Sequence, residues 1–277
     1  MTPAQVPAGR LVVCPTPIGN LEDVTLRVLA VLEAADVVAC EDTRHSRVLF
    51  DRHGIVRPLV SLHEHNERAR AGELVARIQA GAVVALVSDA GTPLLSDPGF
   101  ALVRACLEAN LAVEVLPGPS AVTTALVASG LPVGRWCFVG FLPRKRAELE
   151  DLLAHSAETL VAFESPRRLP ATLRLIAARD PERPVAVCRE LTKLHEEVTR
   201  AGAGQLAEHY GHSPVRGEVV LVIGGVAEGG ARRDEALAAL RGLVDAGARA
   251  RPAAAVVSSL TGVRANELYR ELMGDGQ

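Results

Sequence analysis

Lysine, aromatic residues and paired cysteines are scarce in this sequence. Lys145 and Lys193 are the only lysines, so nearly all positive charge is arginine, and aromatic residues make up 3% of the chain. The formal net charge is -3, so the overall basic charge typical of nucleic-acid-binding proteins is absent, although a local basic patch is compatible with it. The five cysteines form no CxxC pair, which disfavours a zinc site and predicts buried thiols in a reducing cytosol.

Long apolar segments and the common nucleotide-binding motifs are also missing. The longest apolar runs have the length of a strand, far below the roughly 20 residues of a membrane span. The N-terminal MTPAQVPAGR does not have the pattern of a signal peptide. Neither GxGxxG nor GxxxxGK[ST] follows a predicted strand, which disfavours dinucleotide-binding Rossmann enzymes and P-loop ATPases. We therefore expect a cytoplasmic protein with no membrane segment and no metal site.

Short apolar runs alternate with segments of helical periodicity. The runs at 11–14, 37–40, 59–62, 83–88 and 113–116 are predicted strands, and helices are predicted between them. Because these runs are continuously apolar rather than alternating, they indicate strands buried on both faces, as in a largely parallel sheet covered by helices. Four later strands are predicted at CFVGFL, TLVAFE, VAVCREL and EVVLVIGG.

The alternation is interrupted at PGPS, residues 117–120. We place a domain boundary there, which gives an α/β protein with an N-terminal α/β domain at 1–117 and a second α/β domain at 118–226. About three short helices are predicted at 232–277. They are compatible with a helix-turn-helix arrangement and equally with a compact interaction module.

Two loops rich in glycine, proline and aspartate follow predicted strands. They are PTPIGN at 15–20 and SDAGTPLLSDPG at 88–99. Open α/β sheets bind ligands at the carboxyl ends of their parallel strands, and glycine lets backbone amides approach a ligand closely. The same residues also dominate ordinary turns, so either loop alone leaves both interpretations open.

Charged motifs give further candidates, each with a structural alternative. CEDTRHSR at 40–47 predicts either a charged cleft wall or a helix start capped by Asp42 or Thr43. The spacing of the histidines in HEHNE disfavours metal binding. Five basic residues are candidates for binding RNA phosphate, or else form a solvated surface; they are Arg144, Lys145, Arg146, Arg167 and Arg168.

Nine motifs occur in an order that identifies a family resemblance. They are TPIGNLEDVTLRVL, ACEDTRHS, HEHNE, SDAGTPLLSDPG, LPGPSAVTTALVASGLP, GFLPRK, FESPRRL, RELTKLHEE and GEVVLVIGG. Together they closely resemble the ribosomal RNA small-subunit methyltransferase I family, whose members methylate the ribose 2′-hydroxyl of one cytidine in 16S rRNA. The combination of TPIGN with SDAGTP is the most specific part of the match.

The resemblance implies a fold, a cofactor and partners. The fold is two α/β domains of the tetrapyrrole-methylase type with S-adenosyl-L-methionine in the cleft between them, plus a small C-terminal helical extension. The partners are 16S rRNA within the 30S subunit and a second copy of the chain in a homodimer. The implied cofactor-binding residues are Pro17, Ser88, Asp89, Ala90, Gly91, Thr92, Ser120, Ala121, Phe163, Gly217 and Glu218.

The reaction implied by the resemblance needs a group that accepts the proton of the ribose hydroxyl. Glu41, Asp42 and Glu190 are candidates, and so is Lys193 if burial lowers its pKa. Arg44 and Arg189 are candidates for holding phosphate. Two alternative functions remain open: a tetrapyrrole C-methyltransferase of the same fold, and a non-catalytic ribosome-assembly factor.

Overall fold

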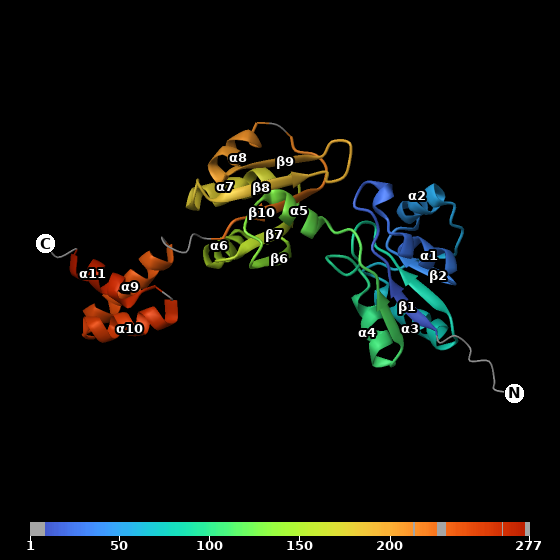
Figure 1. Cartoon of the computed structure of the whole chain (residues 1–277), viewed down its shortest axis with the longest axis horizontal. Helices are drawn as coiled ribbons and strands as arrows, with labels where there is room; N and C mark the ends of the chain where they lie inside the picture. Colours follow the sequence, from blue (N-terminus) through green and yellow to red (C-terminus); the bar gives the residue numbers. More distant parts are fainter. Residues whose placement is uncertain (1–8, 213, 226–230, 262, 275–277) are drawn as a thin grey trace. The chain divides into compact units, whose positions relative to one another are not determined.

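The computed structural model describes residues 9–212, 214–225, 231–261 and 263–274 (Figure 1). These residues form two compact units. The first contains the described residues up to Arg144 together with Thr159–Gly224, and it holds both β-sheets. The second contains Lys145–Glu158 and the described residues from Gly225 onward. Both sheets lie in one unit, so this division into units does not test the predicted boundary near residue 117. The predicted boundary at 226 lies outside the described residues.

The first sheet has five parallel strands in the order β3-β2-β4-β1-β5. The strands are β1 (Arg10–Val13), β2 (Val37–Cys40), β3 (Leu59–Ser61), β4 (Val83–Leu86) and β5 (Ala112–Val115). Successive residues of β1 and β2 point to opposite faces, and both faces are buried: Val12 and Val38 belong to one apolar cluster, Val13 and Val37 to the other. This confirms the predicted parallel sheet, since continuous apolar runs serve strands that are covered on both sides.

Four helices cover the two faces of this sheet (Figure 1). They are α1 (Leu26–Ala34), α2 (Thr43–His53), α3 (Glu67–Gln79) and α4 (Phe100–Glu108). Side chains of α1 and α2 pack into one cluster, and side chains of α3 and α4 into the other. Local sequence sets the helix ends: Thr25 caps α1 by accepting from the N–H of Val28, and Gly54 ends α2 in the left-handed conformation.

The second sheet has five strands in the order β6-β7-β10-β8-β9. They are β6 (Trp136–Phe141), β7 (Thr159–Glu164), β8 (Pro184–Arg189), β9 (Glu197–Gly202) and β10 (Val219–Ile223). Helix α5 (Ala121–Ser129) packs on one face, with Val122 and Leu126 against Val161 and Val222. Helices α7 (Leu169–Arg179) and α8 (Ala203–His209) pack against each other.

This second sheet corrects the sequence prediction in two respects. Only β6 and β7 are parallel, and the other pairs are antiparallel, so the predicted largely parallel arrangement applies to the first sheet alone. The edge strand β9 is not among the predicted strands. Its sequence EVTRAG has no continuous apolar run, and none of its residues is fully buried.

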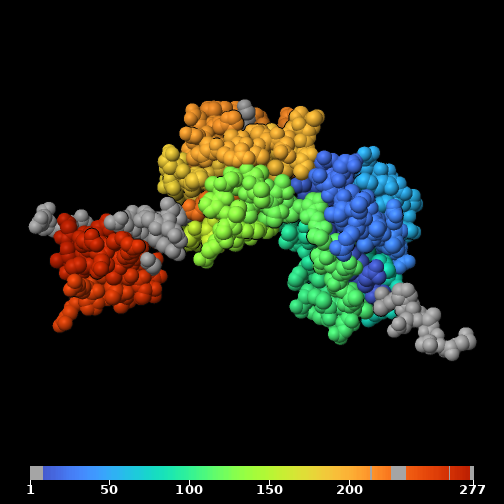
Figure 2. All heavy atoms as spheres, in the orientation of Figure 1, coloured from blue at the N-terminus to red at the C-terminus, as the bar shows by residue number. Residues whose placement is uncertain are grey.

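The second unit contains four helices among the described residues, and the three near the C-terminus form their own core (Figure 2). The helices are α6 (Arg146–His155), α9 (Ala231–Asp245), α10 (Ala250–Thr261) and α11 (Ala265–Gly274). Leu240, Val257 and Leu268 bury the contact between α9, α10 and α11. Throughout the part of the chain that is described, no helix combines the length and the apolar character needed to span a membrane.

Candidate active site

The two loops singled out in the sequence meet at one edge of the first sheet. Because β1 and β4 are adjacent and parallel, the loops that follow them emerge side by side. The N–H of Thr16 donates to the carbonyl of Gly91 at 2.8 Å, and the N–H of Gly91 donates to the carbonyl of Thr16 at 3.0 Å. This two-residue bridge joins PTPIGN to SDAGTP and fixes the position of Gly91.

Glycine is required at residue 91 by both conformation and space. Its φ is +74°, in the left-handed region that side chains disfavour. A Cβ there would lie 3.3 Å from Cγ2 of Ile18 and 3.8 Å from the carbonyl oxygen of Pro119. A side chain at residue 91 would therefore strain the backbone and crowd Ile18.

A cavity of about 360 Å³ opens beside Gly91. Most of the predicted cofactor-binding residues line it; they are Ala90, Gly91, Thr92, Ser120, Ala121, Phe163, Gly217 and Glu218. Ile18, Leu95, Val122, Leu191 and Val220 supply apolar wall. The size and the apolar lining with a few polar groups are typical of a small-molecule site.

The other three predicted cofactor-binding residues support the loops and do not line the cavity. Pro17 is buried directly before Ile18. Ser88 is 2% exposed, and Asp89 accepts a hydrogen bond from the N–H of Asp42 at 3.1 Å. Asp89 thus connects the loop after β4 to the loop after β2. The sequence motif alone does not show whether Asp89 holds the loops in position or binds a ligand.

Glu41, Asp42 and Arg44 lie at the end of β2 and the start of α2, outside the lining of this cavity. Asp42 caps α2 by accepting from the N–H of Arg44 at 2.8 Å, and its carboxylate also pairs with the Arg44 guanidinium. The side-chain bond to Arg44 has the largest effect and the backbone bond the next, and together they lower the pKa of Asp42 to about 2. The carboxylate of Asp42 is therefore a weak base. Burial, reinforced by Asp89 and Asp42, raises the pKa of Glu41.

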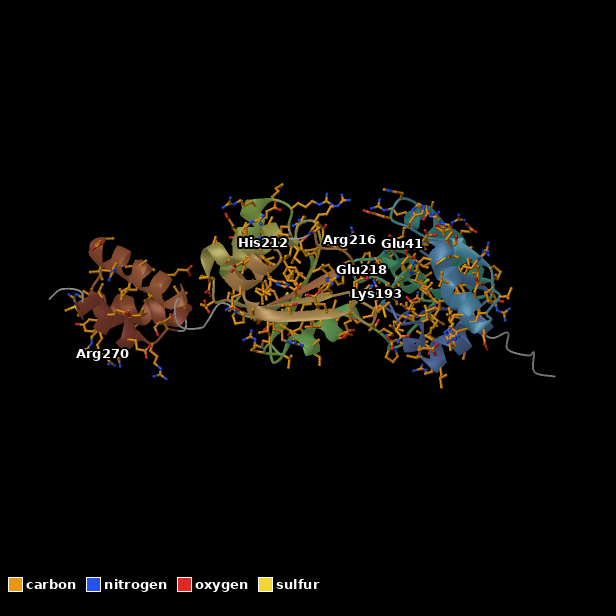
Figure 3. All side chains as sticks on the ribbon, turned by 90° about the horizontal axis from the view of Figure 1, so that it is seen from above. Glu41, Lys193, His212, Arg216, Glu218 and Arg270 are labelled. Atoms are coloured by element: carbon orange, nitrogen blue, oxygen red, sulfur yellow. The ribbon has the colours of Figure 1, made fainter. Side chains whose placement is uncertain are left out.

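Lys193 pairs with two carboxylates. It was a candidate base only if burial lowered its pKa, and that condition is not met. Its Nζ lies 3.0 Å from Glu190 and 2.9 Å from Glu218 (Figure 3). Burial alone would lower the pKa of Lys193, but the hydrogen bonds to Glu218 and Glu190 outweigh it and raise that pKa. Glu190 accepts from the N–H of Glu218, which, together with Lys193, lowers the pKa of Glu190. Lys193 therefore forms ion pairs with Glu190 and with Glu218, of which Glu218 lines the cavity.

Arg168 and Arg189, both predicted to bind RNA phosphate, are instead engaged inside the protein. Arg189 donates to Glu197 at 2.6 Å and to the carbonyl of Arg216 at 3.2 Å. Arg168 pairs with Glu164, whose side chain is fully buried, and donates to the carbonyls of Leu142 and Pro143. Because the Glu164 carboxylate is fully buried, the contacts of Arg168 favour a role in stabilising the fold. Glu197, the partner of Arg189, is partly exposed, so phosphate binding by Arg189 stays a prediction.

The other predicted phosphate-binding residues are exposed. Arg144, Lys145, Arg146 and Arg167 all have exposed side chains. Lys145 pairs with Glu148 and Arg146 with Glu150, at spacings of three and four residues along one helix. Exposed pairs of this kind contribute about 0–1 kcal/mol, so a phosphate can replace the carboxylate partner at little cost.

One residue of the cavity wall, Asp97, is missing from the sequence prediction. It lies in SDPG at the end of the loop after β4, and its half-buried carboxyl lines the cavity. Burial first, then the charges of Glu41 and Asp89, raise the pKa of Asp97 to about 6. SDPG belongs to the candidate ligand loop at 88–99, but the resemblance does not single out Asp97 within it. The signal that would do so is its proximity to Glu41 at the end of β2, which only the fold reveals.

Comparison with known proteins gives concordant results. Residues 10–207 match the family described as Tetrapyrrole (Corrin/Porphyrin) Methylases. The protein named ribosomal RNA small subunit methyltransferase I of Mesorhizobium japonicum is 45% identical over 277 residues, which cover 98% of this chain and 94% of that protein. The relative of that name in Mycobacterium bovis is 46% identical over 269 residues, 95% of this chain and 94% of its own.

A solved structure has the same fold. Uroporphyrin-III C-methyltransferase from Thermus thermophilus complexed with S-adenyl homocysteine has a TM-score of 0.56 and is 23% identical, and the match covers 78% of this chain and 97% of that chain. The predicted fold class and family are confirmed.

Proposed function

Since the chain belongs to the tetrapyrrole methylase family, as a member of its ribosomal RNA small subunit methyltransferase I group, we propose that it methylates the ribose 2′-hydroxyl of a cytidine in 16S rRNA, with S-adenosylmethionine as donor. The observation that carries the proposal is identity of 45% over 98% of the chain. The cavity at the joined loops supports the proposal, because it can hold a small-molecule donor. We propose further that the protein acts on the 30S subunit as a cytoplasmic homodimer.

The residues around the cavity fit the proposed donor. S-adenosylmethionine combines a flat adenine ring, a sulfonium cation and an amino-acid group. The apolar wall of Ile18, Val122 and Val220 suits the ring, and the N-terminal end of α5 at Ser120 suits a carboxylate. The space beside Gly91 lets the donor approach the backbone. Acidic side chains on the wall, Asp97 and Glu218, favour a cation.

The contribution of the protein to the reaction is alignment and exclusion of water. When bound, S-adenosylmethionine supplies an electrophilic methyl group on positively charged sulfur. Gly91, Thr92 and Ser120 would hold it against the loops, and the apolar wall would exclude water. Alignment of the reacting atoms can supply roughly 7–11 kcal/mol of barrier reduction.

The proposal is tested by mapping methylation in 16S rRNA. Purified protein, labelled donor and 30S subunits from a strain lacking the gene are expected to give one 2′-O-methylcytidine, located by mass spectrometry. Parallel reactions with uroporphyrinogen test the C-methyltransferase alternative. Binding to 30S subunits without donor binding would instead identify a non-catalytic assembly factor. Label in the porphyrin and none in the rRNA would overturn the proposal.

The exposed basic residues are expected to set the salt dependence of RNA binding. Each phosphate contact contributes about -0.7 to the slope of log affinity against log salt for single-stranded nucleic acid. Replacing Arg144, Lys145 and Arg146 together by alanine should therefore make the slope shallower by about 2 if all three contact phosphate. The measurement is binding of 30S subunits across a salt series, with Arg104→Ala as control because Arg104 is also an exposed residue paired with a glutamate, on α4. A slope equal to that of the wild type would exclude this cluster from the interface.

A further inference from the structure

The part of the cavity rim that belongs to the second sheet is built from three neighbouring strand ends. Strand β10 pairs antiparallel with β7 on one side and with β8 on the other, so that Val219 lies opposite both Glu164 and Arg189. The segments after β7 and β8 and the segment before β10 therefore leave the sheet at the same edge. They supply the lining residues Ser165, Pro166, Leu191, Gly217 and Glu218. Residues directly next to these in the sequence lie at the rim of the cavity.

Two exposed arginines adjoin this lining. Arg216 directly precedes Gly217, and Arg167 directly follows Pro166. Neither guanidinium pairs with a carboxylate within the part of the chain that the structure describes. The acids of these strand ends pair with other cations: Glu164 with Arg168, Glu197 with Arg189, and both Glu190 and Glu218 with Lys193. Both arginines therefore place positive charge at the rim, with their hydrogen-bond donors open to solvent.

The backbone that carries Arg216 is held in place by the neighbouring strand end. Arg189 donates to the carbonyl of Arg216 at 3.2 Å, and the N–H of Glu218 donates to the carboxylate of Glu190 at 2.8 Å. Between these contacts Gly217 has a φ of +84°, and a Cβ there would lie 2.5 Å from Cδ of Glu190. Only glycine fits so close to Glu190. The chain therefore fixes where the Arg216 side chain begins and leaves its guanidinium available to a ligand.

Lys193 compensates the two acids that adjoin Gly217. Its Nζ lies 3.0 Å from Glu190 and 2.9 Å from Glu218, and Figure 3 shows Lys193, Glu218 and Arg216 at this end of the second sheet. Lys193 also packs against the loop after β1, because a Cβ at Gly19 would lie 2.5 Å from Cγ of Lys193. The repulsion that these acids would exert on an anion at Arg216 is thereby reduced.

We propose that Arg216 and Arg167 bind a backbone phosphate of the acceptor RNA strand at the rim of the cavity, an inference that rests on the proposed function. A ribose that presents its 2′-hydroxyl to a donor inside the cavity is linked to a phosphate on each side, and these charged groups stay outside the apolar wall. The guanidinium fork of arginine matches the oxygens of a phosphate, and such contacts fix the register of a nucleic-acid strand. The two arginines thus determine which ribose reaches the donor.

The test compares 30S binding of Arg216→Ala, Arg167→Ala and the double variant across a salt series. Each single substitution should weaken binding about tenfold or more. It should also make the slope of log affinity against log salt shallower by about 0.7, and the double variant should make it shallower by about 1.4. Arg216→Lys keeps the charge without the fork, so it should keep the slope and recover part of the affinity. Arg174→Ala, at an exposed arginine on α7 outside the lining of the cavity, is the matched control and should bind like the wild type.

Two further measurements on Arg216→Ala distinguish a phosphate contact from other roles. The affinity for S-adenosylmethionine, measured by calorimetry, should equal that of the wild type. The single-turnover rate of methyl transfer should also reach the wild-type value once both donor and 30S subunits are saturating, because the phosphate contact contributes to binding of the acceptor.

Wild-type 30S affinity and salt slope in Arg216→Ala would overturn the inference and leave the proposed function standing. A loss of donor affinity would instead make Arg216 a donor-binding residue, and a loss of 30S affinity with an unchanged salt slope would make it structural. Wild-type protein that methylates no rRNA would overturn the proposed function itself, and the inference with it.

Discussion

Valine at position 91 should weaken binding of S-adenosylmethionine by about a hundredfold while the protein stays folded. The backbone at Gly91 has a φ of +74° and borders the cavity. A valine side chain would extend toward Ile18 and Pro119, whose nearest atoms already lie 3.3 Å and 3.8 Å from the Cβ position. If the valine displaces the donor from an area about the size of one apolar side chain, binding loses about 1.5–3 kcal/mol. Each 1.4 kcal/mol is about tenfold in affinity.

The matched control separates lost space from backbone strain. Gly54 ends α2 with nearly the same φ, +68°, and a Cβ there meets nothing within 4 Å. Gly54→Val therefore carries the same conformational cost, about 1–2 kcal/mol, without touching the cavity. Calorimetric titration with donor should give wild-type affinity for Gly54→Val and strongly reduced affinity for Gly91→Val. Equal affinities in two folded variants would move the donor away from the 88–92 loop.

The position of Gly91 illustrates what the sequence could predict. Strands of the first sheet are continuous apolar runs because both of their faces are buried, so β1, β2 and β4 are found from composition alone. Once these strands are taken as parallel, the loops after them must share one edge of the sheet. That reasoning leads to the two loops at 15–20 and 88–99, and the family resemblance then singles out Gly91 and Thr92, which line the cavity. Strand β9 was not predicted, because its sequence has no comparable apolar run.

What could not be predicted depends on contacts between residues far apart in the sequence. The pKa of Asp97 depends on Glu41, which lies at the end of β2 and more than 50 residues away in the sequence. Likewise Arg167 and Arg168 are adjacent arginines in SPRRLP, and composition treats them alike. The structure exposes the first and directs the second toward a buried carboxylate. Burial of a partner thus decides whether an arginine binds a ligand or stabilises the fold, and a linear pattern does not encode it.

The second large effect follows from this difference between the two arginines. Arg168→Ala should lower the free energy of unfolding by about 3 kcal/mol, because removing one member of a buried ion pair leaves the other charge uncompensated. The side chain of Glu164 is 0% exposed, and Arg168 Nε lies 3.3 Å from its carboxylate. The same guanidinium also donates to the carbonyls of Leu142 at 3.1 Å and Pro143 at 2.6 Å. We take the lower end of the range for broken buried pairs because Arg168 is 31% exposed and water partly replaces it.

Urea unfolding of Arg168→Ala and Arg167→Ala tests this assignment directly. Arg167 is exposed, so its substitution should change stability by less than about 0.5 kcal/mol and should instead weaken binding to 30S subunits. Adding Glu164→Gln to Arg168→Ala should restore part of the lost stability, because a neutral amide needs no cation. Its oxygen can accept from the N–H of Ser165, and its NH2 group can donate to the hydroxyl of Thr172. The opposite pattern, with Arg168→Ala fully stable but defective in RNA binding, would return Arg168 to the RNA interface that its sequence context predicts.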